Sequence, residues 1–240
     1  MTERPWHLIT GEYPPQSGGV SDYTAVLARA LAAAGCEVHV WAPAVQGAAA
    51  GGSRVHVHRL ADGFSDAGLH ALTAELDRLP GPHTILVQYV AQAFGARGMN
   101  VGFCRWVQHR AREHRGDVRV MFHEPFYPFT VWPLQRNVLA LVNRMMAVLL
   151  LSDIRVAYVS TEAWQRRLRR YAPRARRFVW LPIASSAISG PTVHWSRNCS
   201  NRPWPACSRS NATCGCASSA PAVRRWRVTC ARTLPTGGPG

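Results

Sequence analysis

The chain has 240 residues, a formal net charge of +15 and 47% hydrophobic residues. This length and apolar content suffice for a buried core, which excludes a chain that is disordered throughout. All 28 basic residues are Arg, a bias typical of GC-rich genomes, so the positive charge by itself does not indicate a nucleic-acid partner.

Residues 187–240 differ in composition from the rest of the chain. They contain seven Arg, no Asp or Glu, and five of the seven Cys. Residues 1–186 hold only Cys36 and Cys104, and the start of the chain has no basic segment followed by a long apolar run. We therefore expect no secretory signal, and a reduced, cytoplasmic domain over residues 1–186.

Short apolar runs rich in β-branched residues alternate with helical patterns up to residue 183. The predicted strands cover residues 7–10, 37–43, 54–60, 84–90, 118–124, 155–160 and 178–183. This alternation is typical of βαβ units with a parallel sheet. We predict an α/β fold with a single Rossmann-like domain, whose strand order the sequence does not give.

The first helix is predicted between the strands at residues 7–10 and 37–43. Apolar residues recur there at spacings of three and four, which places them on one helix face, and Gly35 follows as a stop signal. The residues of this predicted face are Val20, Tyr23, Leu27, Leu31 and Ala34.

The most apolar segment covers residues 138–151. It is interrupted by Asn143 and Arg144 and is shorter than the roughly 20 residues that a bilayer span needs. We therefore predict a buried helix here, with attachment to a membrane surface as an alternative.

The segment GEYPPQSGGVSDYT, residues 11–24, lies between the first strand and the first helix. Gly18 and Gly19 allow close approach of the backbone to a ligand, and the following helix presents unpaired N–H groups that suit a phosphate. The spacing fits neither the dinucleotide fingerprint nor a P-loop. The alternative is an ordinary turn between strand and helix, because the glycine pair alone is a weak signal.

Four segments, taken together in this order, resemble the subfamily-4-like N-terminal domain of GT-B glycosyltransferases over residues 6–186. They are HLITGEYPPQSGGVSDYTAVLARALAAAGCEVHVWAP, VQYVAQAFGARGMNVGFC, VMFHEPFYPF and VAYVSTEAWQRRLRRYAPRARRFVWLPIASS. The resemblance implies the acceptor-side half of an enzyme that transfers a sugar from a nucleotide-sugar donor. It further implies transfer with retention, with neither a metal nor a cofactor, in a cleft shared with a second Rossmann half.

The same resemblance assigns roles to particular residues. It implies that Gly18 and Gly19 approach the donor phosphates, and that His123, at the end of a predicted strand, faces the transferred sugar as the catalytic residue. Carboxyl ends of parallel strands are where such sheets bind ligands, which independently favours His123. Gln88 and Tyr89 end a predicted strand at the same rim and, with Glu124, are candidate acceptor contacts. A purely structural role remains open for His123 and Glu124.

Two further groups of side chains are candidates for binding. Residues 166–177 contain seven Arg. If this segment is a helix that packs through Trp164, Leu168 and Tyr171, the arginines lie on its outer face. They would then contact an anionic membrane, a polyphosphate acceptor or only solvent. His56 and His58 share one strand face, but no third ligand accompanies them, so we predict no metal site.

Residues 187–240 lack helical or strand periodicity and are rich in Pro, so we predict a disordered, basic tail. Its composition is that of a GC-rich gene read out of frame, which suggests a frameshift and the absence of a donor-binding domain. The chain would then be a glycosyltransferase half that is inactive alone. The alternatives are a noncatalytic remnant, or a binding module whose Arg-rich tail contacts anionic partners; nucleic acid is not expected.

Overall fold

The computed structural model describes residues 4–47, 52–79, 81–95, 98–113, 116–131, 135–173 and 176–181. The predictions of disorder and of a frameshift for residues 187–240 fall outside the described residues.

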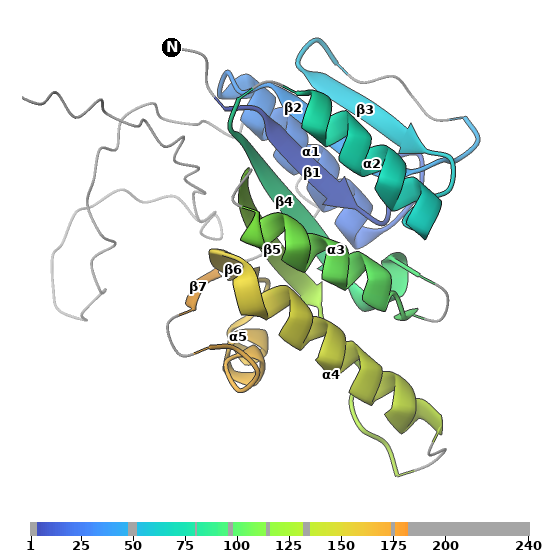
Figure 1. Cartoon of the computed structure of the whole chain (residues 1–240), viewed down its shortest axis with the longest axis vertical. Helices are drawn as coiled ribbons and strands as arrows, with labels where there is room; N and C mark the ends of the chain where they lie inside the picture. The colour runs from blue at the N-terminus through green and yellow to red at the C-terminus, as the bar shows by residue number, and fades with distance from the viewer. Residues whose placement is uncertain are drawn as a thin grey trace, which may run out of the picture. The chain divides into compact units, whose positions relative to one another are not determined.

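Within the described residues, seven strands form one parallel sheet with the order β3-β2-β1-β4-β5-β6-β7 (Figure 1). The strands are Trp6–Thr10 (β1), Val38–Pro43 (β2), Val55–Leu60 (β3), His83–Val90 (β4), Gly116–Glu124 (β5), Val156–Val159 (β6) and Arg177–Trp180 (β7). This sheet confirms the predicted α/β class and its seven parallel strands. The strand order, which the sequence did not give, reverses direction between β1 and β4.

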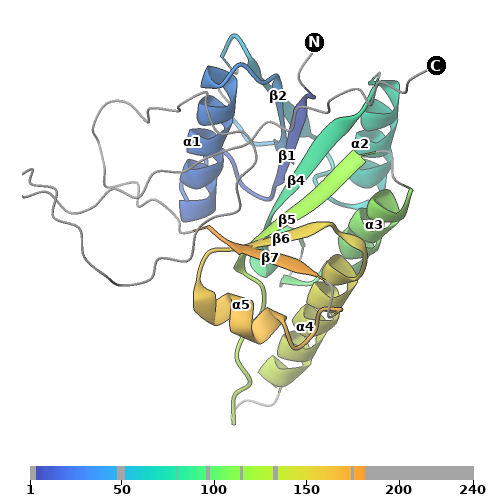
Figure 2. The same ribbon diagram turned by 90° about the vertical axis from the view of Figure 1, so that its left-hand side faces the viewer.

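Helices cover both faces of the sheet. They are Gly19–Ala33 (α1), Asp66–Arg78 (α2), Val101–Arg112 (α3), Gln135–Asp153 (α4) and Glu162–Leu168 (α5), with a 3₁₀ turn, η1, at Ala91–Ala93. Figure 2 shows α1 on one face and α2, α3 and α4 on the other. Helix α5 packs on β6 and β7, and its wholly buried Leu168 joins the apolar core under α2, α3 and α4.

Helix α1 ends as predicted but buries a different face. Gly35, with φ of 97°, allows the amide of Cys36 to donate to the carbonyl of Leu31 in a Schellman motif. The predicted face is wrong in its orientation, because Tyr23 and Leu27 are only half-buried. The small side chains let the helix lie close to the sheet. The buried residues are Ser21, Thr24, Ala25, Ala28, Ala30 and Leu31.

Helix α4 is buried along one side only, so the prediction of a buried helix is half wrong. Ala140, Met146 and Leu150 are fully buried, because α4 packs against α3 on this side. The opposite side carries an exposed apolar row made of Val138, Leu141, Met145 and Val148. No helix in the described part of the chain is long and apolar enough to cross a membrane.

An irregularity in the β4–β5 pairing sets the position of His123. Tyr89 pairs with Phe122, whereas the next residue, Val90, pairs with Glu124, so His123 is the extra residue of a bulge. Bulges bend a strand and redirect its side chains, and they are frequent near active sites.

Candidate functional site

The candidate site lies where the sheet changes direction. From β1 the chain continues outward to β2 and β3, whereas from β4 it continues the other way to β5, β6 and β7. Ligands of open α/β sheets bind beyond the carboxyl ends of the strands at such a switch point. Thr10, Gln88, His123 and Ser160 lie at or just after the carboxyl ends of β1, β4, β5 and β6, respectively.

His123 and Gln88 form a buried pair at these strand ends. The distance from His123 Nε2 to Gln88 Oε1 is 2.8 Å, and the two residues are 4% and 0% exposed. Because an amide oxygen only accepts, Nε2 carries the proton and Nδ1 is left as an acceptor. Burial lowers the pKa of His123 from 6.5 to about 4, so the ring is neutral at pH 7.

Two buried polar atoms of this pair have no partner among the described residues: Nδ1 of His123 and Nε2 of Gln88. Buried polar atoms are nearly always hydrogen-bonded in folded proteins, and leaving one unpaired costs about 1–3 kcal/mol. The pair therefore offers one free acceptor and one free amide donor, groups that can each form a hydrogen bond with a hydroxyl.

Neighbouring elements hold His123 in place. Ser160 Oγ donates to the carbonyl oxygen of His123 at 3.1 Å, and the Ser160 amide donates to the carbonyl of Phe122 at 3.1 Å. From α1, the ring of Tyr23 meets the His123 ring edge-on, with centroids 5.2 Å apart. Burial raises the pKa of Tyr23 above its ordinary value, so its hydroxyl stays protonated.

The Gly18–Gly19 loop contacts a carboxylate of the chain itself. Glu12 Oε1 accepts hydrogen bonds from the amides of Val20 and Ser21 in the first turn of α1, each at 3.2 Å. A Cβ on Gly18 would lie 2.6 Å from this oxygen, whereas a Cβ on Gly19 would meet nothing within 4 Å. Glu12 thus occupies an anion-binding position, and Gly18 makes room for it.

The other two candidate residues lie apart from the pair. Tyr89 is 0% exposed and lies on the opposite face of the sheet from Gln88, because side chains alternate along a strand. Its ring packs against those of Phe94 and Phe122. Glu124 follows His123 directly and is exposed at the rim.

Sequence reasoning singled out Gln88 and His123 but missed Glu12, Tyr23 and Ser160. An acidic residue shortly before a helix start was a signal for Glu12, because carboxylates stabilise helix N-termini. No local signal marks Tyr23 or Ser160, whose contacts with His123 join different elements of the fold.

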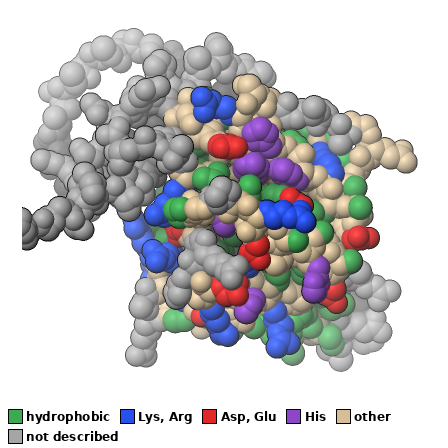
Figure 3. All heavy atoms as spheres, turned by 45° about the horizontal axis from the view of Figure 1, so that its top comes forward, with side chains coloured by type: hydrophobic (Ala, Val, Ile, Leu, Met, Phe, Trp, Pro, Cys, Tyr) green, Lys and Arg blue, Asp and Glu red, His purple; other side chains and the backbone are tan. Residues whose placement is uncertain are grey.

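Histidines also form a row across β1, β2 and β3. Figure 3 shows several histidine side chains close together on one face of the molecule. His7 is in register with His39, and His39 with His56. The ring centroids lie 4.8 Å and 5.0 Å apart, and His39 Nδ1 lies 3.0 Å from Nε2 of His58. Even so, no three His, Cys, Asp or Glu side chains of the described residues are arranged to hold a metal ion.

Comparison with known proteins shows a similarity of fold. No protein-family model matches the chain, and no curated protein matches it. Among solved structures, it is similar to sucrose-phosphate synthase from Thermosynechococcus elongatus, with 16% sequence identity and a TM-score of 0.58. The chain shares its fold with half of this synthase. The alignment covers 75% of this chain and 48% of the synthase.

The shared fold agrees with the Rossmann-like half-domain that the sequence resemblance implied, and at 16% identity this similarity shows the fold alone. A nucleoside-diphosphate-sugar epimerase from Agrobacterium tumefaciens aligns over 80% of this chain and 56% of its own length. Its identity is 12% and its TM-score 0.33, so it supports no inference here.

Proposed function

We propose that the described domain is the acceptor-side half of a GT-B glycosyltransferase, which transfers a sugar from a nucleotide-sugar donor to an acceptor. The observation that carries this proposal is the buried His123–Gln88 pair, with one free acceptor and one free donor at the switch point of the sheet. The similarity of the fold to half of a sucrose-phosphate synthase supports it.

In this function the pair binds hydroxyl groups of the sugar. Neutral His123 accepts a hydrogen bond from a sugar hydroxyl through Nδ1, and the Gln88 amide donates a hydrogen bond to a hydroxyl oxygen. Burial strengthens both hydrogen bonds, because water does not compete with them. Glu124 at the rim is a further candidate contact for the acceptor, while Tyr89 would act only by packing behind β4.

Donor binding and catalysis would require a second Rossmann half facing this one. Transfer would proceed with retention and without a metal, because helix N-termini and Arg side chains can stabilise the charge of the departing pyrophosphate. For Gly18 and Gly19 to approach the donor phosphates, the Glu12 carboxylate would have to leave the N-terminus of α1, since both groups are anionic. We expect the 240-residue chain alone to transfer no sugar.

NMR titration of the His123 ring tests this function directly. His123→Gln assigns the imidazole signal, and the exposed His70 on α2 serves as the internal control. We expect sugars with free hydroxyls to shift the His123 signal but not that of His70, and Gln88→Leu to abolish the shift. Nucleotide sugars such as UDP-glucose should release no sugar in the presence of the chain.

Two outcomes would contradict the proposal. If none of a panel of mono- and disaccharides moves the His123 signal, the pair is structural. If the chain alone transfers sugar from a nucleotide sugar, the requirement for a second half is wrong.

A further inference from the structure

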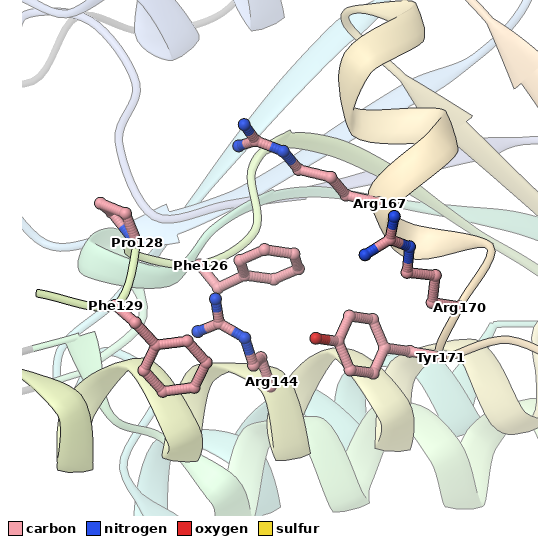
Figure 4. A pocket seen from close by; sticks show the side chains of 7 residues that line it. All are labelled: Phe126, Pro128, Phe129, Arg144, Arg167, Arg170 and Tyr171. Atoms are coloured by element: carbon pink, nitrogen blue, oxygen red, sulfur yellow. The ribbon is translucent and has the colours of Figure 1, made fainter.

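A pocket of about 240 Å³ opens between the loop that follows β5, helix α4 and the end of α5 (Figure 4). Seven residues line it: Phe126, Pro128, Phe129, Arg144, Arg167, Arg170 and Tyr171. Three of them are arginines and none is acidic, so the pocket is strongly electropositive. The loop begins directly after His123 and Glu124, which connects this pocket to the candidate site along the chain.

Arg144 is held in a fixed position at the base of the pocket. Its guanidinium lies 4.6 Å from the ring centroid of Phe126 and 3.9 Å from that of Phe129. One terminal nitrogen donates to the carbonyl oxygens of Tyr127, at 3.0 Å, and Ala140, at 2.7 Å. A cation that is already immobilised loses little conformational entropy when it binds a ligand.

Arg167 and Arg170 supply two further charges from α5 and the turn after it. Both side chains are exposed, and neither forms an ion pair with an acidic side chain of the described residues. In Figure 4 the guanidinium of Arg170 and the hydroxyl of Tyr171 point into the space beside Phe126. Three arginines and a tyrosine hydroxyl thus line the pocket with no acidic side chain among the lining residues, and the guanidinium of Arg167 lies over the ring of Trp164.

We propose that this pocket binds the phosphate of a phosphorylated ligand. Guanidinium groups match phosphate oxygens in geometry and charge, and these hydrogen bonds are stronger than those between neutral groups. The volume is below the roughly 300–1,000 Å³ of sites for drug-sized ligands, which favours a small phosphate ester or a lipid headgroup. The identification of this ligand as the acceptor rests on the proposed function.

The phosphate could belong to a soluble sugar phosphate or to the headgroup of an anionic lipid. The exposed apolar row of α4, together with Phe129, which is 56% exposed, would accommodate the apolar part of a lipid. The phosphate contacts are the same in both cases, so the binding experiment has one arm for each source.

The experiment compares matched charge variants of the full chain. In the first arm, calorimetry measures binding of glucose 6-phosphate, with glucose as the uncharged control. In the second arm, sedimentation measures binding to phosphatidylcholine vesicles with and without phosphatidylglycerol. The test variant is Arg167→Gln with Arg170→Gln, and the control is Arg166→Gln with Arg169→Gln, which removes the same charge from the same segment but outside the pocket.

We expect the phosphorylated probe of one arm to bind and its uncharged control not to bind. The test variant should weaken this binding by about tenfold or more, because it removes two charge-assisted contacts, while the control variant stays within about twofold. Binding only to vesicles with phosphatidylglycerol would assign the phosphate to a lipid headgroup.

Equal losses in the two variants would show attraction by net charge alone and would overturn the site, as would absence of binding in both arms. These measurements need no sugar transfer, so failure here is distinguishable from failure of the proposed function at His123.

Discussion

At the first turn of α1, the carboxylate of Glu12 gives two adjacent glycines different structural roles. Gly18 and Gly19 are adjacent in sequence, yet only Gly18 lies against Glu12, whose carboxylate accepts from the amides of Val20 and Ser21. A negative charge at a helix N-terminus is stabilising, and it competes with any anionic ligand for the same amides. The two glycines therefore have different roles, which substitution can separate.

Replacing each glycine by alanine tests this difference. Gly18→Ala should lower the free energy of unfolding by about 1–2 kcal/mol, because the new Cβ displaces the Glu12 cap. Gly19→Ala should be neutral or stabilising by up to about 1 kcal/mol, because alanine favours the helix and meets no neighbour. Urea unfolding measures both changes.

A double-mutant cycle identifies the cause. If Gly18→Ala destabilises the protein by displacing Glu12, it should lower the free energy of unfolding only slightly in a protein that already carries Glu12→Ala. A full, additive loss in that background would show that Gly18 acts through something other than the cap.

At the scale of elements, α4 illustrates how polar residues inside an apolar segment are used. Asn143 is fully buried and donates to the carbonyl of Gly98 at 2.7 Å, while Arg144 stacks on Phe126 and Phe129. The two residues that interrupt the apolar segment thus anchor α4 to two loops.

The two sides of α4 should respond differently to truncation. Leu150→Ala should lower the free energy of unfolding by about 2–5 kcal/mol, because Leu150 is 0% exposed and leaves a cavity. Leu141→Ala, at a position 62% exposed, should change it by about 0.5 kcal/mol or less. Chemical denaturation of the two variants gives the comparison, and similar losses would mean that α4 is covered on both sides.

At the scale of the whole molecule, buried histidines link stability to pH. Burial lowers the pKa of His7 to about 3 and that of His123 to about 4, from 6.5. It also lowers the pKa values of His39, His58 and His83. Nearby carboxylates of Glu37, Glu75 and Asp77 oppose this effect, and Arg110 adds to it at His83.

The sign of the pH dependence follows from these directions. The unfolded chain binds protons at these histidines below pH 6.5, whereas the folded chain does not until lower pH, so acid favours unfolding. We expect the free energy of unfolding to be constant above about pH 7 and to fall by about 2 kcal/mol for each of His7 and His123 by about pH 5. Urea unfolding at several pH values tests this.

His123→Gln should make the fall in the free energy of unfolding between about pH 7 and about pH 5 smaller by about 2 kcal/mol, which is the contribution expected of one buried histidine. Stability that stays constant down to about pH 5, and falls only where carboxylates titrate, would contradict the expected role of the buried rings.

The sequence alone determined the order and kind of the elements. Runs of β-branched residues and helical spacings act locally, so the seven strands and the stop of α1 at Gly35 could be predicted within a few residues. The candidate site was also partly visible, because Gln88 and His123 both end predicted strands. Alternation along β4 places Tyr89 opposite Gln88, and this was readable from the same pattern.

The tertiary structure decided which of these residues meet. Strand order brings β4 beside β5, and the bulge at His123 turns its ring toward Gln88, 35 residues earlier in the chain. The Glu12 cap, the contact of Tyr23 with His123 and the three-arginine pocket likewise depend on packing between elements. Local sequence propensity carries no information about these contacts, because they form only when segments distant in the chain pack against one another in the folded core.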